Sequence, residues 1–261
     1  MKKNLHFASA RQNEFYKEIK SVADRKPTWE VWADWIEMVA LLFSVASEFR
    51  PKVREERAKR YLDIAKKYSQ DELNAFDRML DILVDALEDQ PEQDFLGEMY
   101  QALNLNDHWK GQFFTPYDVA VLMAKITMSD VKEQTKDRDW AEVSILDPCS
   151  GAAVLLIAAR NHFARIGMGY DKVLFVGEDI DKIAGLMGYI QMSLLGCAGY
   201  IAIGDSLAHP VVWHNGSKLL PKDDPAYELW FMPILRSPIW EYRRAKALLE
   251  LETNCKDDKE I

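Results

Sequence analysis

Acidic residues end three short apolar segments in the second half of the sequence. Asp147, Glu178 and Asp205 each follow a run of apolar residues that has the length of a β-strand. In an open parallel sheet, ligands bind beyond the carboxyl ends of the strands, which meet at one edge. Carboxylates there can accept hydrogen bonds from ribose hydroxyls or from a base amino group, and can pair with an ammonium group. Three acids in equivalent positions therefore predict a nucleoside-binding site.

The first of these acids opens a loop with the sequence Asp-Pro-Cys-Ser-Gly at 147–151. Gly151 would let the backbone approach a ligand closely, and the N-terminus of the helix predicted to follow favours a carboxylate. Asp147 could meet an ammonium group or could order the loop, with Pro148 beside it. An ordinary strand-to-helix turn can have the same composition, so this loop indicates a binding site only in combination with the other acids.

The acids of the second and third segments have two interpretations each. Glu178 lies 31 residues after Asp147 and can accept two hydrogen bonds from the 2′,3′-diol of a ribose. Asp179 could do the same, but we favour a role for it as the cap of the following helix. Asp205 could accept a hydrogen bond from an adenine amino group, or it could order a turn.

Strand and helix patterns alternate around these acids. In chain order, the sequence predicts strand 143–146, helix 151–165, strand 172–177, helix 181–195 and strand 200–203. This order is typical of an α/β fold in which the strands pair in parallel. A fourth strand at 228–235 contains Pro233, which argues against a central place in the sheet. A last helix is predicted over 239–251.

The first hundred residues have helical periodicity instead. Apolar residues three or four positions apart follow Thr28, which is a plausible N-cap. Ser-Gln-Asp-Glu at 69–72 has the pattern of a capping box before another apolar run, and a short helix is predicted over 94–103. Segments of β-branched alternation are few here. We therefore predict a helical domain over 1–105 and an α/β domain over 106–261.

Composition limits the class of protein. The chain has 261 residues, of which 48% are hydrophobic and 29% charged, as in ordinary globular proteins. Its longest apolar run is too short to span a bilayer, and its N-terminus lacks the apolar core of a secretory signal. The three cysteines are far apart and have no metal-ligand spacing. We expect a cytoplasmic protein without a membrane partner or a bound metal.

The net charge of −9 bears on nucleic-acid binding, because proteins that grip phosphates usually carry a basic excess. Contact with DNA would need a local basic patch or a partner subunit. The best local candidate is the cluster of Arg236, Arg243, Arg244 and Lys246. The alternative interpretation of this cluster is a solvated helix face.

Four short motifs occur in one order and at even spacing. They are Gly-Gln-Phe-Phe-Thr-Pro at 111–116, Asp-Pro-Cys-Ser-Gly at 147–151, Gly-Glu-Asp at 177–179 and Gly-Asp-Ser-Leu at 204–207. Together with the segment 94–100, they resemble the modification (M) subunit of type I restriction–modification systems, which is an adenine-N6 DNA methyltransferase. The resemblance covers nearly half of the chain, and its first two motifs are specific.

The resemblance implies a Rossmann-like, S-adenosylmethionine-dependent methyltransferase sheet preceded by a helical domain. S-adenosylmethionine would be the cofactor and DNA the substrate, with a specificity subunit or other restriction–modification subunits as partners. Phe114, Thr115 and Pro116 would close over the methionine end of the cofactor. The loop 147–151 would line its amino-acid moiety.

Two further cofactor contacts and one departure follow from the same resemblance. Glu178, with Asp179 as its neighbour, would hold the ribose, and Asp205 would lie beside the adenine of the cofactor. The family loop usually ends in a second glycine, where this chain has Ala153. If that position needs a positive φ, alanine costs about 1 kcal/mol or more. We expect its methyl group to point toward the ligand and to weaken cofactor binding.

The catalytic loop of the family, Asn-Pro-Pro-Tyr/Phe, does not occur in the sequence. In that loop, two acceptors hold the target amino group close to tetrahedral geometry, and an aromatic residue stacks on the flipped base. The nearest match is Ser-Pro-Ile-Trp at 237–240, in which Ser237 and Pro238 would supply the acceptors and Trp240 would stack. Ile239 replaces a proline, and Ser237 lies 32 residues after Asp205, which is a longer gap than expected.

These motifs predict an adenine-N6 DNA methyltransferase with a degenerate catalytic loop. The alternative is a catalytically inactive binding or regulatory protein of the same fold, which Ala153, the missing loop and the acidic charge favour. A methyltransferase that acts on RNA or on a protein amide is a third reading, and Gly-Gln-Phe-Phe-Thr-Pro argues against it. A dinucleotide site would need Gly-x-Gly-x-x-Gly, which the sequence lacks.

Overall fold

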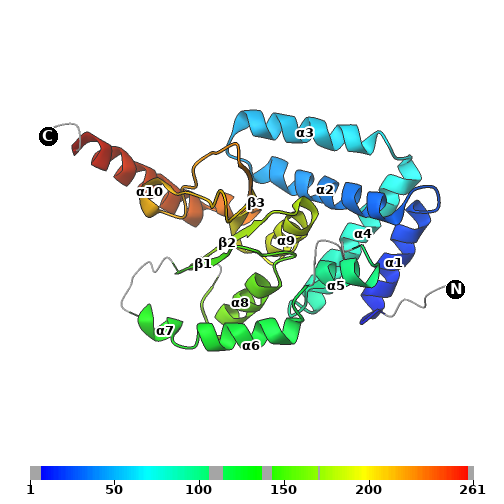
Figure 1. The fold of residues 1–261 in the computed structure, drawn as a ribbon, viewed down its shortest axis with the longest axis horizontal. Helices are drawn as coiled ribbons and strands as arrows, with labels where there is room; N and C mark the ends of the chain where they lie inside the picture. The colour runs from blue at the N-terminus through cyan, green and yellow to red at the C-terminus, as the bar shows by residue number, and fades with distance from the viewer. Residues whose placement is uncertain (1–6, 106–113, 137–142, 170, 258–261) are drawn as a thin grey trace.

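The computed structural model describes residues 7–105, 114–136, 143–169 and 171–257 (Figure 1). Its centre is a sheet of four strands in the order β1-β2-β3-β4. The strands are β1 (Val143–Asp147), β2 (Val173–Asp179), β3 (Ala198–Gly204) and β4 (Tyr227–Phe231). The first three are parallel, and β4 pairs antiparallel with β3. The predicted α/β class with parallel strands is confirmed.

Helices join the parallel strands as the sequence predicted. They are α8 (Val154–Arg165) and α9 (Lys182–Leu194), and both pack on one face of the sheet. After β3 the chain passes through the 3-10 turn η2 (His214–Gly216) to β4, and then through η3 (Pro233–Arg236) to α10 (Pro238–Asp257). The segment around Leu219 and the start of α10 cover the opposite face. The strands β2 and β3 thus place alternate side chains into two apolar layers.

The strand β4 is an edge of the sheet, as the proline that follows it suggested. Its outer side is covered, because the Leu229 carbonyl accepts hydrogen bonds from the guanidinium groups of Arg50, at 3.1 Å, and Arg57, at 2.9 Å. The opposite edge is β1, which pairs only with β2 within the described part of the chain. Among the described residues, no side chain donates a hydrogen bond to the outer side of β1 as the two arginines do for β4.

In the described part of the chain, five α-helices come before residue 105, and two more lead into the sheet. They are α1 (Ala10–Val22), α2 (Thr28–Ser47), α3 (Pro51–Ala65), α4 (Gln70–Asp89), α5 (Phe95–Ala102), α6 (Tyr117–Thr127) and α7 (Val131–Gln134). The capping box at Ser69 and Glu72 is present in full. The prediction of Thr28 as an N-cap is wrong. Thr28 is the first helical residue, and the cap position is held by Pro27, which makes no side-chain hydrogen bond.

The N-terminal helices pack directly on the sheet layer. The Phe231 carbonyl at the end of β4 accepts hydrogen bonds from Ser47 Oγ at 2.7 Å and Tyr189 Oη at 3.1 Å, which come from α2 and α9. One apolar cluster contains side chains of α1, α2, α4, α8 and α9. The division at residue 105 stays a prediction. Among the described residues, no helix is both long and apolar enough to cross a membrane.

Candidate cofactor site

Hydrogen bonds tie the loops at the carboxyl ends of β1, β2 and β3 to one another. The backbone N–H of Gly151, after β1, donates to Asp179 Oδ2, after β2, at 2.7 Å. Ser206 Oγ, after β3, donates to the Pro148 carbonyl at 2.7 Å. The three strand-end acids predicted from the sequence therefore lie along one rim of the sheet.

Asp147 is the acid of this rim that has a buried carboxylate oxygen without a described partner. Its side chain is 8% exposed, and Oδ1 accepts a hydrogen bond from the Cys149 N–H at 3.2 Å. Its other oxygen, Oδ2, is buried without a partner in the described part of the chain, and so is Ser150 Oγ. Burial raises the pKa of Asp147, and the charge of Asp179 adds to the effect. A buried carboxylate oxygen without a donor fits the ammonium group of an amino-acid ligand.

Glu178 turns to the other face of the sheet. It continues the row of Leu174 and Val176 on β2, and its side chain is almost fully buried. Its Oε2 accepts a hydrogen bond from the Val211 N–H at 3.2 Å, and its backbone carbonyl accepts one from the Ser150 N–H at 2.9 Å. Burial raises the pKa of Glu178. The carboxylate thus lies at the predicted strand end, beneath the segment that follows β3.

Asp179 links two loops, and the interpretation of it as the helix cap is wrong. Its Oδ1 accepts from the Asp181 N–H at 2.8 Å, and its Oδ2 accepts from Gly151. The cap of α9 is Asp181, whose Oδ1 accepts from the N–H groups of Ile183 and Ala184 at 2.9 and 3.0 Å. Asp179 therefore fixes the Gly151 turn against the start of α9.

Asp205 closes a turn after β3. Its Oδ1 accepts hydrogen bonds from the backbone N–H groups of Leu207 and Ala208 at 3.0 and 3.1 Å. Its carbonyl accepts from the His209 N–H at 2.7 Å. These contacts match the turn-forming alternative that the sequence left open for Asp205. They also keep the Asp205 carboxylate on the rim, because the next residue, Ser206, donates to the Pro148 carbonyl of the loop after β1.

The Phe114 ring lies against the Gly151 turn. A Cβ atom added at Gly151, where φ is +53°, would be 3.0 Å from this ring. The ring makes an edge contact with Tyr100 at 5.8 Å between centroids, and Gln101 Nε2 donates to the Phe114 carbonyl at 3.3 Å. Helix α5 therefore holds the predicted cofactor-closing segment in contact with the loop after β1, as a shared binding site requires.

Thr115 and Pro116 lie on the other side of the same segment. Together with Phe114 they line a pocket of about 560 Å³ between α5 and the start of α1. The first part of the motif, 111–113, lies outside the described residues. The structure thus places the end of the motif between the loop after β1 and this pocket.

Gln191 of α9 supports the loop after β1 from the helix side, a role that was not predicted from the sequence. This fully buried side chain donates from Nε2 to Asp94 Oδ1 at 2.8 Å and to the Ala152 carbonyl at 2.9 Å. Its Oε1 accepts from the Leu96 N–H at 3.1 Å. One amide therefore joins the start of α5 to the loop after β1. A polar residue on the apolar face of a predicted helix was the available signal.

Ala153 adopts the positive φ expected of the glycine it replaces. Its φ is +73° and ψ is 25°, in the left-handed region. The expectation that its methyl group points toward the ligand is wrong, because the residue is fully buried against α9. A Cβ atom added at Gly188 would lie 3.1 Å from this methyl carbon and 3.0 Å from the Gly151 carbonyl oxygen. The methyl group fills the space that Gly188 leaves.

This contact predicts that Gly188→Ala will displace the loop after β1. We expect the free energy of unfolding to fall by about 1 to 3 kcal/mol, as for other overpacked sites. The matched variant Gly188→Ala/Ala153→Gly should recover part of the loss, because it removes the opposing methyl group. Urea titration of the single and double variants measures both effects. An unchanged midpoint for Gly188→Ala would contradict the packing described here.

The structure does not bring the predicted catalytic residues to the rim. Because β4 is antiparallel to β3, its last residue Phe231 lies opposite Tyr200, near the start of β3. The chain that follows therefore leaves the sheet at the amino ends of the parallel strands. Ser237, Pro238 and Trp240 lie there, at the end of the sheet opposite to the strand-end acids.

Trp240 is also a core residue. It is 1% exposed and belongs to the apolar layer under the sheet, with the Arg243 guanidinium 4.6 Å from its ring centre. A side chain in this position cannot stack on a base. The prediction of Ser237, Pro238 and Trp240 as catalytic residues is therefore corrected, because they lie away from the rim.

The basic cluster, which consists of Arg236 of η3 and Arg243, Arg244 and Lys246 of α10, is partly engaged within the protein. Arg243 is 8% exposed, and the Arg244 guanidinium lies 3.6 Å from the ring centre of Phe49. Arg236 lies over the same ring at 4.9 Å. The solvated face that the sequence allowed thus describes Arg236 and Lys246, which are exposed, and not the buried Arg243. The arginines of the cluster are stacked on aromatic rings, which leaves Lys246 as its most exposed cation.

Comparison with known proteins gives a family match to the part of the chain that forms this site. Residues 91–219, slightly less than half of the chain, match the N-6 DNA methylase family. No curated protein matches the sequence. The match supports an adenine-N6 methyltransferase family for this segment and implies S-adenosylmethionine as the cofactor.

One solved structure is similar to the chain at low identity. It is a crystal structure described as a class I S-adenosylmethionine-dependent methyltransferase from Listeria monocytogenes. The identity is 13% and the TM-score 0.39, with 84% of this chain and 66% of that chain covered. The chain therefore spans slightly less than two thirds of that protein.

Proposed function

We propose that the protein binds S-adenosylmethionine at the rim formed by the loops after β1, β2 and β3, and serves in the N6-methylation of adenine in DNA. We further propose that it works as the M-type subunit of a restriction–modification system. The observation that carries the proposal is the buried Asp147 Oδ2, which has no partner among the described residues and lies beside the turn that Phe114 covers. The family match over 91–219 supports it.

Each part of the rim has a role in this proposal. Asp147, next to Pro148, would accept hydrogen bonds from the ammonium group of the ligand's amino-acid moiety. The N-terminus of α8 would favour the carboxylate of the same moiety. Glu178 would hold the ribose hydroxyls, and Asp205 would lie by the adenine. Asp179 would act indirectly, because its two oxygens hold the Gly151 and Asp181 backbone. Phe114, Thr115 and Pro116 would close over the methionine end.

The electrostatics of the rim suit this ligand. S-adenosylmethionine supplies a methyl group on a positively charged sulfur. Four carboxylic acids lie at the ends of the three parallel strands: Asp147, Glu178, Asp179 and Asp205. Their negative charge favours a ligand with an ammonium and a sulfonium group over an anionic dinucleotide. Phe114 covers the loop after β1 and would keep water from that end of the site.

The groups that would hold the target amino group are not assigned in this chain. Transfer to adenine needs two acceptors at the amino nitrogen, because its lone pair is otherwise delocalised into the ring. Ser237 and Pro238, the residues predicted for this task, lie at the opposite end of the sheet. In our proposal these acceptors come to the rim from a partner subunit.

The test of cofactor binding is calorimetry with S-adenosylmethionine. Asp147→Asn keeps the shape of the side chain but removes the charge, so we expect roughly 10- to 100-fold weaker binding, which corresponds to about 1.5 to 3 kcal/mol. Asp118→Asn, on the exposed surface of α6, is the matched control and should bind as tightly as the unaltered protein. Equal affinity of both variants would overturn the assignment.

The test of the reaction is transfer of labelled methyl groups to unmethylated duplex DNA, with RNA and protein as parallel substrates. The assay is run with and without candidate specificity subunits. The second candidate function is a cofactor-binding protein without catalysis, which the placement of Ser237 favours. Cofactor binding without transfer to any substrate under all of these conditions would establish that second function.

A further inference from the structure

We propose that the outer edge of β1 and the exposed face of α6 form a docking surface for a second polypeptide, which adds a β-strand beside β1. The apolar face of α6 consists of Val119, Leu122, Met123 and Ile126, which are 46%, 57%, 44% and 67% exposed. These residues lie three and four positions apart, so they form one stripe along the helix. We call them the α6 stripe.

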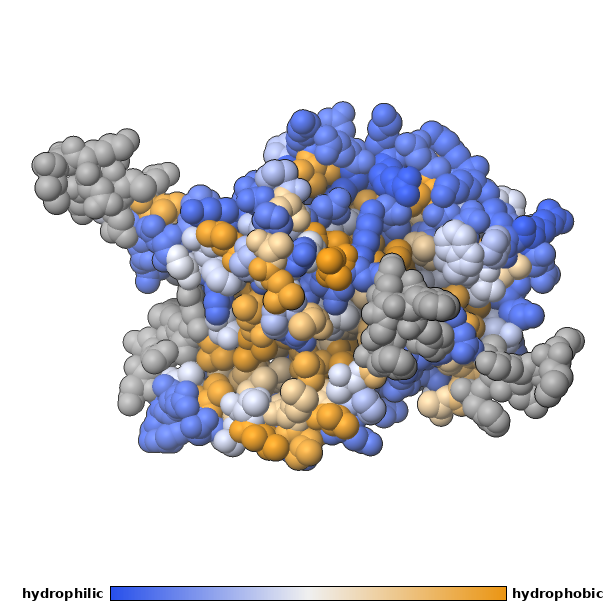
Figure 2. Space-filling model, viewed as in Figure 1, coloured by the Kyte–Doolittle hydropathy of each residue, from blue (hydrophilic) through white to orange (hydrophobic). Residues whose placement is uncertain are grey.

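The α6 stripe faces away from the contacts that α6 makes. Ala120 and Ala124, on the other side of the helix, pack with Val154 and Ala158 of α8. Figure 2 shows hydrophobic residues gathered in the lower part of the molecule, over the region where Figure 1 draws α6, α8 and the sheet. Soluble proteins rarely expose a continuous apolar patch unless it meets a partner.

The edge strand β1 has the composition of an interior strand. Its residues before Asp147 are Val143, Ser144, Ile145 and Leu146, and none is charged. Leu146 is 38% exposed, whereas the matching positions of β2 are buried. Natural edge strands are usually protected by charges, prolines or a covering element. Among the described residues, two arginines cover the β4 edge in this way, and no hydrogen bond gives the β1 edge similar cover.

The arrangement of the layers indicates what covers this surface. Helix α9 contacts β2 and β3, α8 contacts β1, and α6 packs against α8. Figure 1 shows α6 beyond α8, on the side away from α9. Packed helices lie about 8 to 10 Å apart and paired strands about 4.8 Å apart. The helix layer therefore extends past β1 by the width of one or two strands. An extended chain with apolar side chains toward α6 fits both features.

A second copy of this chain fits the surface less well. A two-fold axis would pair β1 with β1 of the copy in antiparallel fashion. It would also bring the α8 of the copy, which lies beneath the new strand, into the space that α6 already occupies. The net charge of −9 on each copy opposes self-association as well. We therefore assign the surface to a different polypeptide that contributes a strand.

The docked strand would have a consequence for the cofactor site, which rests on the function proposed above. In doubly wound sheets, ligands bind where the strand order reverses. The described order β1-β2-β3-β4 does not reverse, so the crevice is open on the outer side of Asp147. A strand parallel to β1 would end beside Asp147 and could bring the missing acceptors to the rim.

The test uses a labelled ten-residue peptide, Val-Thr-Val-Lys-Val-Thr-Val-Lys-Val-Thr, which is prone to form a strand with all of its valines on one face. We expect saturable binding by fluorescence anisotropy, with slower hydrogen exchange of amides in 143–147. Leu122→Asp/Ile126→Asp should weaken binding at least tenfold. The matched control Leu62→Asp, which changes an exposed leucine on α3, should leave binding unchanged. Circular dichroism establishes that each variant is folded.

A peptide with N-methylated valines cannot pair along one edge and should not bind. Absence of binding by the unmodified peptide, equal binding by the methylated one, or insensitivity to the α6 substitutions would each overturn the proposal. Sedimentation that shows a dimer disrupted by Leu122→Asp would overturn it in favour of a second copy. None of these measurements contains S-adenosylmethionine, so failure here is separate from failure of the proposed function.

Discussion

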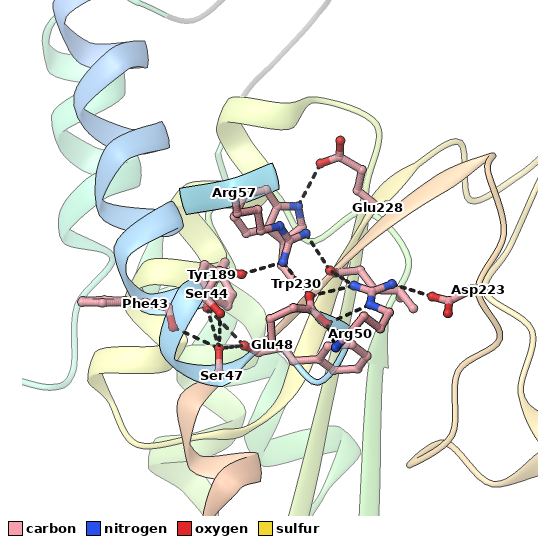
Figure 3. Close-up of polar contacts among 12 residues, drawn as sticks. Phe43, Ser44, Ser47, Glu48, Arg50, Arg57, Tyr189, Asp223, Glu228 and Trp230 are labelled. Carbon is pink, nitrogen blue, oxygen red and sulfur yellow. Dashed lines mark hydrogen bonds and ion pairs between the residues drawn. The ribbon is translucent and has the colours of Figure 1, made fainter. Parts of the chain in front are cut away.

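Replacement of Arg57 by alanine is expected to lower the free energy of unfolding by about 3 kcal/mol. The guanidinium of this buried residue donates to Ser44 Oγ at 2.6 Å, to Glu48 Oε2 at 2.9 Å and to the Leu229 carbonyl at 2.9 Å (Figure 3). It also lies 3.8 Å from the ring centre of Trp230. Alanine would remove all of these contacts, and Arg50 would remain as the donor to Glu48 and to the Leu229 carbonyl.

The expected size of this loss follows from the remaining pair. Breaking a buried ion pair costs about 3 to 5 kcal/mol when one charge is left alone. The Glu48 side chain is fully buried but also pairs with Arg50 at 2.8 Å, so the lower value applies. Burial opposes ionisation of Glu48, yet the hydrogen bonds from Arg50 and the charges of both arginines outweigh it and lower its pKa. Burial lowers the pKa of Arg57, but a guanidinium stays charged in proteins.

Urea unfolding of Arg57→Ala beside Arg54→Ala tests this prediction. Arg54 is exposed on the same helix, so its loss should change stability by less than about 0.5 kcal/mol. Arg57→Met keeps an apolar stem on the Trp230 ring and should recover the packing part of the loss only. If both alanine variants unfold at the same urea concentration, this network does not hold α3 to β4.

Removal of the ionisable group at Asp94 is expected to change how stability depends on pH. Asp94 Oδ1 accepts hydrogen bonds from the Gly97 N–H at 2.9 Å and from Gln191 Nε2 at 2.8 Å. Burial raises the pKa of this carboxyl from 3.8 to about 6, although both hydrogen bonds act in the opposite direction. The folded protein therefore holds this proton more tightly than the unfolded chain does.

The sign of the effect follows from this difference in pKa. The contribution of Asp94 to stability is complete below about pH 4 and is lost as the pH rises through about 6. The difference between the two pKa values corresponds to roughly 3 kcal/mol. Asp94→Asn keeps an oxygen acceptor and does not titrate. The stability of the unaltered protein minus that of Asp94→Asn should thus fall by roughly 2 to 3 kcal/mol between pH 4 and 7.5.

Urea titrations at several pH values between 4 and 7.5 measure this difference. Asp81→Asn, an exposed position on α4, is the matched control for the loss of one carboxylate. Its stability should run parallel to that of the unaltered protein across this range. Parallel curves for Asp94→Asn would show that the Asp94 carboxyl does not keep its proton in the folded state.

The strands and the acids at their ends could be predicted because both depend on local sequence. Apolar runs define β1, β2 and β3, and Asp147, Glu178 and Asp205 follow them directly. The capping box at Ser69 is equally local, since its two hydrogen bonds join residues three positions apart. Features that a few neighbouring residues determine are therefore read correctly from the sequence.

The placement of the residues after β4 could not be predicted, because it depends on strand direction. A parallel β4 would have delivered Ser237 and Trp240 to the same rim as Asp147. The observed antiparallel pairing delivers them to the opposite end. Periodicity gives the existence of a strand but not its direction. The role of Gln191 was missed for a related reason, since its partners lie 97 and 39 positions away in the sequence.

The double hydrogen bond of Gln191 has a consequence for how the loop after β1, part of the proposed cofactor site, takes its shape. The carbonyl of Ala152 is held by an amide whose other contacts are Asp94 and the Leu96 N–H. The shape of this loop thus depends on a template of residues that precede the first strand in the sequence. A recombinant fragment that began at the sheet would lack this template, and its glycine turn would have to be ordered by the ligand itself.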